Sequence, residues 1–195
     1  KRKEWSAGAC RRHALMNTLC HLQRKLGVLG GPPGTNRKKV KSICPAPGYD
    51  RHFSICQQFG IEMITVRMKE DGPDMDVIEA LVREDDSIKG IWCVPKYSNP
   101  TGITFSDSVV ERLATMKTAA SDFRIFWDNA YMVHSLYDDD DKLKNIFDVA
   151  RKAGTMDRIY SFASTSKITF AGSGVSAIAA SEANIKDIAA KMFFK

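Results

Sequence analysis

The sequence predicts an α/β fold with three layers, αβα, and a mostly parallel sheet in the middle. Beyond Val40, short apolar segments alternate with amphipathic segments of about 10–15 residues, a pattern typical of right-handed β-α-β crossovers. Residues 90–94 (GIWCV) are apolar without alternation, as expected for a strand buried on both faces. The 195 residues are 44% hydrophobic and 27% charged, which is an ordinary globular composition for one large domain.

The first part of the chain is strongly basic. Leucines recur at helical spacing over residues 9–26, which predicts a basic helix. The glycine- and proline-rich residues 27–34 break that helix, and residues 37–41 form a solvated run of charge. We therefore divide the chain into a basic N-terminal segment, residues 1–41, and one large domain, residues 42–195.

The elements that follow are expected to alternate strictly. Strands are expected over residues 40–44, 62–68, 90–94, 124–127, 158–162 and 175–180. Helices are expected over residues 49–59, 75–83, 107–120 and 142–152 and from residue 182 onward. Gly60 should end the first of these helices, Asp74 lies in the turn that caps the second, and Ser106 is a suitable N-cap for the third.

Charge and hydropathy exclude several classes of function. Residues 1–41 hold eleven Lys/Arg and one acidic residue, whereas residues 42–195 hold eighteen Lys/Arg and twenty-two Asp/Glu. The mildly acidic larger part carries no nucleic-acid motif, so we expect no nucleic-acid partner. No stretch reaches the ~18 apolar residues of a membrane span, and the basic N-terminus lacks the apolar region of a secretory signal. We expect a soluble protein without a membrane partner, truncated or processed because it begins at Lys1.

The cysteines indicate a reducing compartment. The chain has five, at Cys10, Cys20, Cys44, Cys56 and Cys93, with no CxxC and no paired Cys/His spacing. A disulfide framework or a metal site would need regular spacing, so neither is expected. We expect free thiols packed as small apolar residues in a cytoplasmic protein.

Polar residues follow the predicted strands where a ligand would bind. In open parallel sheets, ligands bind beyond the carboxyl ends of the strands. That rule points to the loops after Cys44, Val94, Trp127 and Phe162. Asp128 comes directly after an apolar strand, so its carboxylate needs a cationic or protonated partner, unless it caps a helix. Lys167 lies among hydroxyls and is either a surface cation or a desolvated amine suited to Schiff-base chemistry.

Four motifs in these loops together resemble a known family. They are PGY at residues 47–49, SNPTG at 98–102, DNAY at 128–131 and STSK at 164–167. In this order and spacing they resemble the pyridoxal 5'-phosphate (PLP) enzymes of the aspartate aminotransferase fold type, the class I/II aminotransferases. The resemblance runs from about Val40 to Ala180. The stretches CPAPGYDRHF, KGIWCVPKYSNPTG and FRIFWDNAY look like an aspartate-type bacterial subgroup.

The resemblance implies a role for each matching residue. Lys167 would form a Schiff base with PLP and then move a proton between Cα and C4′. Asp128 would pair with the protonated pyridine nitrogen, which also answers the need of its carboxylate for a partner. Asn99 and Tyr131 would donate hydrogen bonds to the phenolate oxygen.

The remaining matches are weaker, and two positions depart from the family pattern. Tyr49 matches the aromatic residue that stacks on the ring, and Ser164 matches a hydroxyl that contacts the phosphate. The family's phosphate-pairing arginine is replaced by Gly174, although backbone amides and hydroxyls can also hold a phosphate. At the front, residues 6–10 match the family's phosphate-binding loop poorly. His52 has either an active-site or a structural role.

The function implied is a transaminase that moves an amino group between an aspartate-like amino acid and a 2-oxo acid. The whole protein is expected to be a homodimer with small-molecule partners and no metal. A complete family member is about twice this length, so we expect the C-terminal small domain to be absent and the isolated chain to be a poor transaminase. The alternatives are a non-catalytic fragment, another PLP enzyme such as a β-lyase, or a PLP-sensing regulator. His134 has no partner pattern and should be a surface or packing residue.

Overall fold

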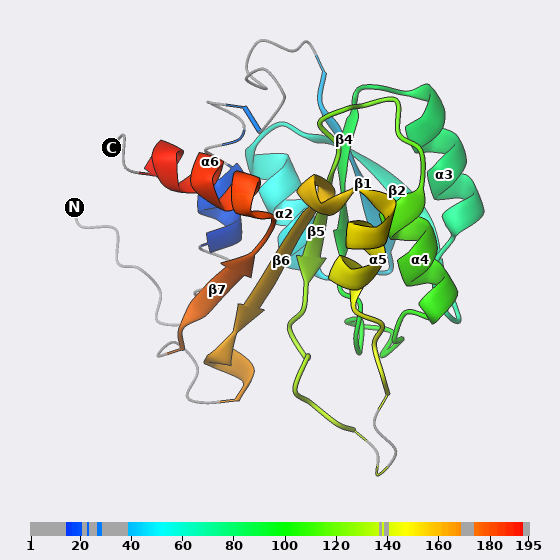
Figure 1. Ribbon diagram of the computed structural model, residues 1–195. Coiled ribbons are helices and arrows are strands. Elements are labelled where there is room, and N and C mark those ends of the chain that lie inside the picture. Colours follow the sequence, from blue (N-terminus) through cyan, green and yellow to red (C-terminus); the bar gives the residue numbers. More distant parts are fainter. Residues whose placement is uncertain are drawn as a thin grey trace, which may run out of the picture.

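A seven-stranded sheet forms the centre of the molecule, with strand order β3-β2-β1-β4-β5-β6-β7 (Figure 1). The computed structural model describes residues 15–20, 23, 27–28, 39–136, 138, 141–168 and 174–192. The strands are β1 Lys41–Ala46, β2 Glu62–Lys69, β3 Gly72–Pro73, β4 Ile88–Cys93, β5 Arg124–Asp128, β6 Ile159–Ser164 and β7 Ser176–Ala179. The helices are α2 Asp50–Gln58, α3 Met75–Glu84, α4 Asp107–Thr115, α5 Ile146–Ala153 and α6 Glu182–Met192.

The sheet is parallel except at its two edges. The neighbouring pairs β2–β1, β1–β4, β4–β5 and β5–β6 are parallel, whereas β3 and β7 pair antiparallel to their neighbours. Parallel pairing follows from the helix that crosses over between successive strands. The predicted fold class, three layers around a mostly parallel sheet, is confirmed.

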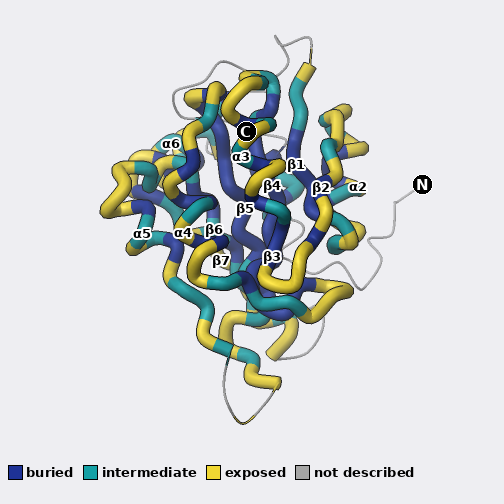
Figure 2. Tube along the Cα trace, turned by 90° about the vertical axis from the view of Figure 1, so that its right-hand side faces the viewer, coloured by how far each residue is buried: buried dark blue, intermediate teal, exposed yellow. Residues whose placement is uncertain are grey.

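Helices cover both faces of the sheet, so the sheet separates two hydrophobic cores. On one face, α3, α4 and α5 pack over a core that includes Trp127. On the other face, α2, α6 and the helical residues 15–20 pack over a core that includes Trp92 and Phe126. The central strands are buried on both sides, as Figure 2 shows for β4 and β5. All three of these aromatic residues are buried.

The predicted helix starts are mostly correct, because capping is a local interaction. The Asp74 side chain accepts a hydrogen bond from the backbone at the start of α3, and Ser106 does the same for α4. Gly60, just after α2, has φ of +61°, a conformation that glycine adopts without strain. Within the basic helix predicted over residues 9–26, residues 15–20 are helical, and most of the remainder lies outside the described residues.

Two helices are shorter than predicted. We expected a helix over residues 107–120, but α4 ends at Thr115. The backbone carbonyls at its end accept hydrogen bonds from side chains that follow α5. Thr155 Oγ1 donates to Ala114 O at 2.7 Å, and Arg158 Nη1 donates to Met116 O at 2.6 Å. We expected α5 to begin at residue 142, but it begins at Ile146, where Asn145 Oδ1 accepts from the first turn.

The cysteines in the described part of the chain are free and buried, as predicted. They are Cys20, Cys44, Cys56 and Cys93, whereas Cys10 lies outside that part. Burial raises the pKa of both Cys20 and Cys93, which keeps these thiols protonated and apolar. No described helix combines the length and the apolar character that a bilayer crossing requires.

Candidate active site

The predicted site residues gather along the edge of the sheet that is formed by the carboxyl ends of four adjacent strands. These strands are β1, β4, β5 and β6. The predicted residues on them or just beyond them are Tyr49, Asn99, Asp128, Tyr131, Ser164 and Lys167. From β1 the chain proceeds to β2, and from β4 it proceeds to β5 on the other side, so the strand order reverses between β1 and β4. Ligands of open α/β sheets bind at such a reversal.

A buried carboxylate lies at the centre of this edge. Asp128 ends β5 and is 0% exposed, and its Oδ2 lies 3.2 Å from Nε2 of His52, which is 4% exposed. The His52 ring stacks on Trp92 at 4.6 Å, and the Tyr49 ring meets it edge-on at 5.6 Å. The sequence predicted that Asp128 would need a partner, and the imidazole of His52 provides one from the first turn of α2.

The loop after β4 turns tightly and leaves Asn99 exposed at its tip. The Gly102 amide donates to Ser98 O at 2.5 Å, and the Ser98 amide donates to Ile103 O at 2.8 Å. Gly102 has φ of +74°, the left-handed region that favours glycine. The loop therefore holds Asn99 by backbone hydrogen bonds on either side of it.

His134 joins the loops that follow β5 and β6. Its amide donates to Tyr131 O at 3.0 Å, and its ring meets the Tyr131 ring edge-on at 5.5 Å. Its Nε2 lies 3.3 Å from the carbonyl oxygen of Lys167. The side chain of Lys167 is exposed. The packing of the His134 ring on Tyr131 agrees with the prediction that His134 is a surface or packing residue, and the same residue also links two of the predicted site residues.

The turn that carries Lys167 has no room for a side chain at Gly174. A Cβ built on Gly174 would lie 2.6 Å from Ser166 Oγ and 2.8 Å from Ser166 N. A side chain at position 174 would therefore displace Ser166. Ser166 Oγ is buried and has no hydrogen-bond partner among the described residues. Sequence reasoning did not single out Ser166, whose only signal was its place in the hydroxyl-rich run.

Metal-binding side chains do not gather here. Within the described ranges, no three His, Cys, Asp or Glu residues lie close enough together to hold a metal ion. The residues that match the family's phosphate-binding loop, 6–10, lie outside those ranges.

The fold and the arrangement of this edge define an α/β protein with a ligand site at the carboxyl ends of its parallel strands. Comparison with known proteins gives the family. The sequence profile described as aspartate amino-transferase matches residues 9–193, a longer stretch than the motifs alone predicted. The chain belongs to this family. It is 53% identical over 154 residues to an aspartate aminotransferase of Corynebacterium glutamicum, covering 79% of this chain and 35% of the relative. It is 57% identical over 160 residues to a Mycolicibacterium smegmatis protein named as an aminotransferase, covering 82% of this chain and 37% of that protein.

Solved structures of aminotransferases and related enzymes have the same fold as this chain. A crystal structure of an aspartate transaminase from Corynebacterium glutamicum superposes with a TM-score of 0.91 at 45% identity, over 96% of this chain and 44% of that chain. The cystalysin of Treponema denticola, whose structure contains pyridoxal 5'-phosphate, shares the fold at 18% identity with a TM-score of 0.68. The chain thus spans well under half the length of the relatives it matches.

Proposed function

We propose that this chain is the cofactor-binding part of a PLP-dependent transaminase that moves an amino group between an aspartate-like amino acid and a 2-oxo acid. The observation that carries the proposal is the completely buried Asp128, held by His52 at the sheet edge where Lys167 also lies. The names of the similar relatives support the reaction class and the aspartate-like substrate.

The residues at this edge fit the chemistry of the cofactor. PLP offers a cationic ring nitrogen, an anionic phosphate and an aldehyde. A buried carboxylate, Asp128, complements the ring nitrogen, and the amine of Lys167 can bind the aldehyde covalently. The buried Ser166 hydroxyl, without a partner among the described residues, suits a phosphate oxygen. When bound, PLP supplies the electron sink that makes the substrate carbon acidic.

Each of these site residues would then have one task. Asp128 would hold a proton on the ring nitrogen, and His52 orients the Asp128 carboxylate through the contact between Nε2 and Oδ2. Asn99 and Tyr131 would donate hydrogen bonds to the ring oxygen, while Tyr49 would cover one face of the ring. Lys167 Nζ would take the proton from the substrate carbon and return it on the cofactor side. Ser164 would assist Ser166 at the phosphate.

We also propose that the whole protein is a cytoplasmic homodimer. The buried free thiols support a reducing compartment. The two loops that His134 joins expose several apolar side chains, which favours an interface at this edge. They are Met132, Val133, Leu136 and Ile168, each more than half exposed.

Covalent labelling tests the proposal. The protein is incubated with PLP, reduced with borohydride and digested, and we expect the pyridoxyl group on Lys167. Two lysines serve as internal controls, since Lys96 is 4% exposed beyond the end of β4 and Lys186 is exposed on α6. A label on Lys96, or labelling spread evenly over the surface lysines, would overturn the assignment.

The matched variants separate binding from chemistry. Lys167→Arg keeps the positive charge and should remove the label, whereas Asp128→Ala should keep some label but lose exchange of the substrate Cα proton. Exchange is followed by NMR with aspartate in heavy water. An Asp128→Ala protein with normal exchange would contradict the role given to the carboxylate.

A further inference from the structure

The backbone of Tyr97, in the loop that follows β4, is strained. Its φ is +49°, and within the described ranges no other residue except glycine has a positive φ. A bulky residue is disfavoured in this left-handed region, and such strain persists only where the surrounding contacts over-determine it. Tyr97 is 6% exposed, so those contacts lie inside the protein. Strained residues gather at functional sites, and Tyr97 lies two positions before Asn99.

The Tyr97 hydroxyl reaches the loop that follows β5. Its oxygen accepts a hydrogen bond from the Leu136 amide at 3.2 Å, although the two residues are 39 positions apart. The other end of Tyr97 leads to the same loop. Its amide donates to Thr104 Oγ1 at 3.4 Å, and Thr104 Oγ1 donates to Asp141 Oδ2 at 3.4 Å. Tyr97 therefore joins the loop after β4 to the loop after β5 at two points.

The ring of Tyr97 is also held from its side. Lys96 Nζ lies 5.1 Å from the ring centroid, within the reach of a cation–π contact, and Lys96 is buried. Backbone hydrogen bonds close the loop itself, since the Phe105 amide donates to Pro95 O at 2.8 Å. The hydroxyl thus lies at a fixed point, which a residue that positions another loop requires.

The loop that follows β5 has few buried side chains to fix its position. One contact is that of His134, whose Nε2 lies 3.3 Å from the Lys167 carbonyl oxygen. Two residues further on, the Leu136 amide donates to Tyr97. A segment with few buried contacts takes its position from such hydrogen bonds. The apolar side chains that this loop exposes by more than half are Met132, Val133 and Leu136.

We propose that Tyr97 is a positioning residue of the candidate active site. Through the Leu136 amide, its hydroxyl would hold the loop that carries Tyr131, so that the Tyr131 hydroxyl stays within reach of the cofactor ring oxygen. Tyr97 would act on Tyr131 and not on the cofactor itself. This inference rests on the proposed function and adds a residue to which the family resemblance gives no role.

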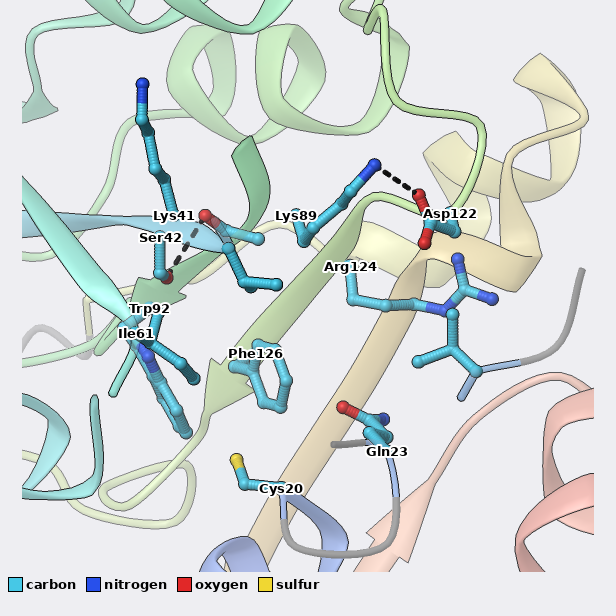
Figure 3. Close-up of a pocket in the computed structure, with 13 residues that line it drawn as sticks. Cys20, Gln23, Lys41, Ser42, Ile61, Lys89, Trp92, Asp122, Arg124 and Phe126 are labelled. Carbon is cyan, nitrogen blue, oxygen red and sulfur yellow. Dashed lines mark hydrogen bonds and ion pairs between the residues drawn. The ribbon is translucent and has the colours of Figure 1, made fainter. Parts of the chain in front are cut away.

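Tyr97→Phe tests the proposal, because it removes one oxygen and keeps the ring beside Lys96. Tyr160→Phe is the matched control. The Tyr160 hydroxyl accepts from Arg124 Nε at 3.3 Å, and Arg124 lines a pocket at the amino end of β5 (Figure 3). In the cofactor-free protein, we measure hydrogen exchange of the Leu136 amide by NMR. It should be about two- to tenfold faster in Tyr97→Phe, the range that a typical hydrogen bond implies, and unchanged in the control. Parental exchange in Tyr97→Phe would overturn the proposal.

In the PLP-loaded protein, the absorbance of the adduct between PLP and Lys167 is followed against pH. A hydroxyl that donates to the anionic ring oxygen lowers the midpoint of this titration, because it compensates the charge of that oxygen once the adduct has lost its proton. Tyr131→Phe and Tyr97→Phe should both raise the midpoint, the latter by about 0.5 pH unit, roughly a threefold change in proton affinity. The double variant should match Tyr131→Phe alone, because Tyr97 acts through Tyr131. A purely structural role would lower stability and leave the midpoint unchanged.

The outcomes separate this inference from the proposed function. A parent protein that forms no adduct at Lys167 overturns both. A parent that forms the adduct, with Tyr97→Phe at the parental midpoint, overturns this inference alone. So does a double variant whose shift is the sum of the two single shifts.

A second pair of variants decides if Tyr97→Phe does not fold, as judged by circular dichroism. Leu136→Pro removes the N–H donor at an exposed loop position and should raise the midpoint as Tyr97→Phe would. Leu136→Ala keeps the donor and should have the parental midpoint. Equal midpoints for the two Leu136 variants would refute the assignment.

Discussion

Replacement of His52 tests how the buried carboxylate is held. His52 Nε2 lies 3.2 Å from Asp128 Oδ2, and its ring stacks on Trp92 at 4.6 Å. His52→Phe keeps a ring on Trp92 but removes the nitrogen. His52→Gln keeps a donor that can reach the carboxylate but removes the ring. The two variants therefore separate the hydrogen bond from the stacking.

The expected magnitudes follow from burial. Asp128 is 0% exposed, so removing a hydrogen-bond partner of its carboxylate costs about 1–3 kcal/mol of unfolding free energy in His52→Phe. Loss of an aromatic pair costs about 0.5–1.5 kcal/mol beyond burial in His52→Gln. The first variant should therefore be at least as unstable as the second, although it changes the packing volume less.

Urea unfolding of the cofactor-free protein, followed by circular dichroism, measures both effects. A double-mutant cycle of His52→Phe with Asp128→Asn should show a coupling of about 1 kcal/mol or more, because the two side chains are in contact. Coupling within the ~0.3–0.5 kcal/mol of independent sites would refute the reasoning. So would a His52→Phe protein as stable as the parent.

Three further predictions follow from local contacts. Ser106→Ala removes the N-cap of α4 and should lower the unfolding free energy by about 0.5–2 kcal/mol, measured in urea. Hydrogen bonds from Lys41 and Ser87 lower the pKa of Asp85 from 3.8 to about 2, so its contribution to stability is present above pH 3.8 and is lost as pH falls toward 2. Asp85→Asn should flatten the fall in melting temperature across that window, and an unchanged slope would contradict the pairing. Gly174→Ala places a Cβ 2.6 Å from Ser166 Oγ and should weaken PLP affinity, measured by cofactor absorbance, with the far-ultraviolet spectrum unchanged.

Much of the fold could be predicted because its signals are local. The apolar run GIWCV marks β4, which is buried along most of its length, and Ser106 marks the start of α4. The end of α4 could not be predicted from nearby residues. Its last carbonyls accept hydrogen bonds from Thr155 and Arg158, about forty positions further along the chain.

The candidate site was predictable as a set of loops, and its contacts were not. The strand order brings Asp128 and Lys167 to one edge, as the rule for parallel sheets predicts. The contact of His52 with Asp128 joins residues 76 positions apart, and no periodicity records such a pairing. The roles given to Tyr49, Asn99 and the other site residues stay predictions until the labelling and exchange experiments are done.

The alternation of side chains along β5 explains why the carboxylate of the candidate active site faces one particular core. In β5, the side chains of Arg124, Phe126 and Asp128 share the face that α2 covers, so the Asp128 carboxylate lies on the same side of the sheet as the Phe126 ring. A shift of register by one residue would turn all three to the opposite core. Gly90 of β4 pairs with Arg124, and a Cβ there would lie 2.9 Å from Arg124 O and 3.2 Å from the Phe126 ring. The close fit at Gly90 therefore fixes the position of β5 beside β4, and with it the position of Asp128 at the end of the same strand.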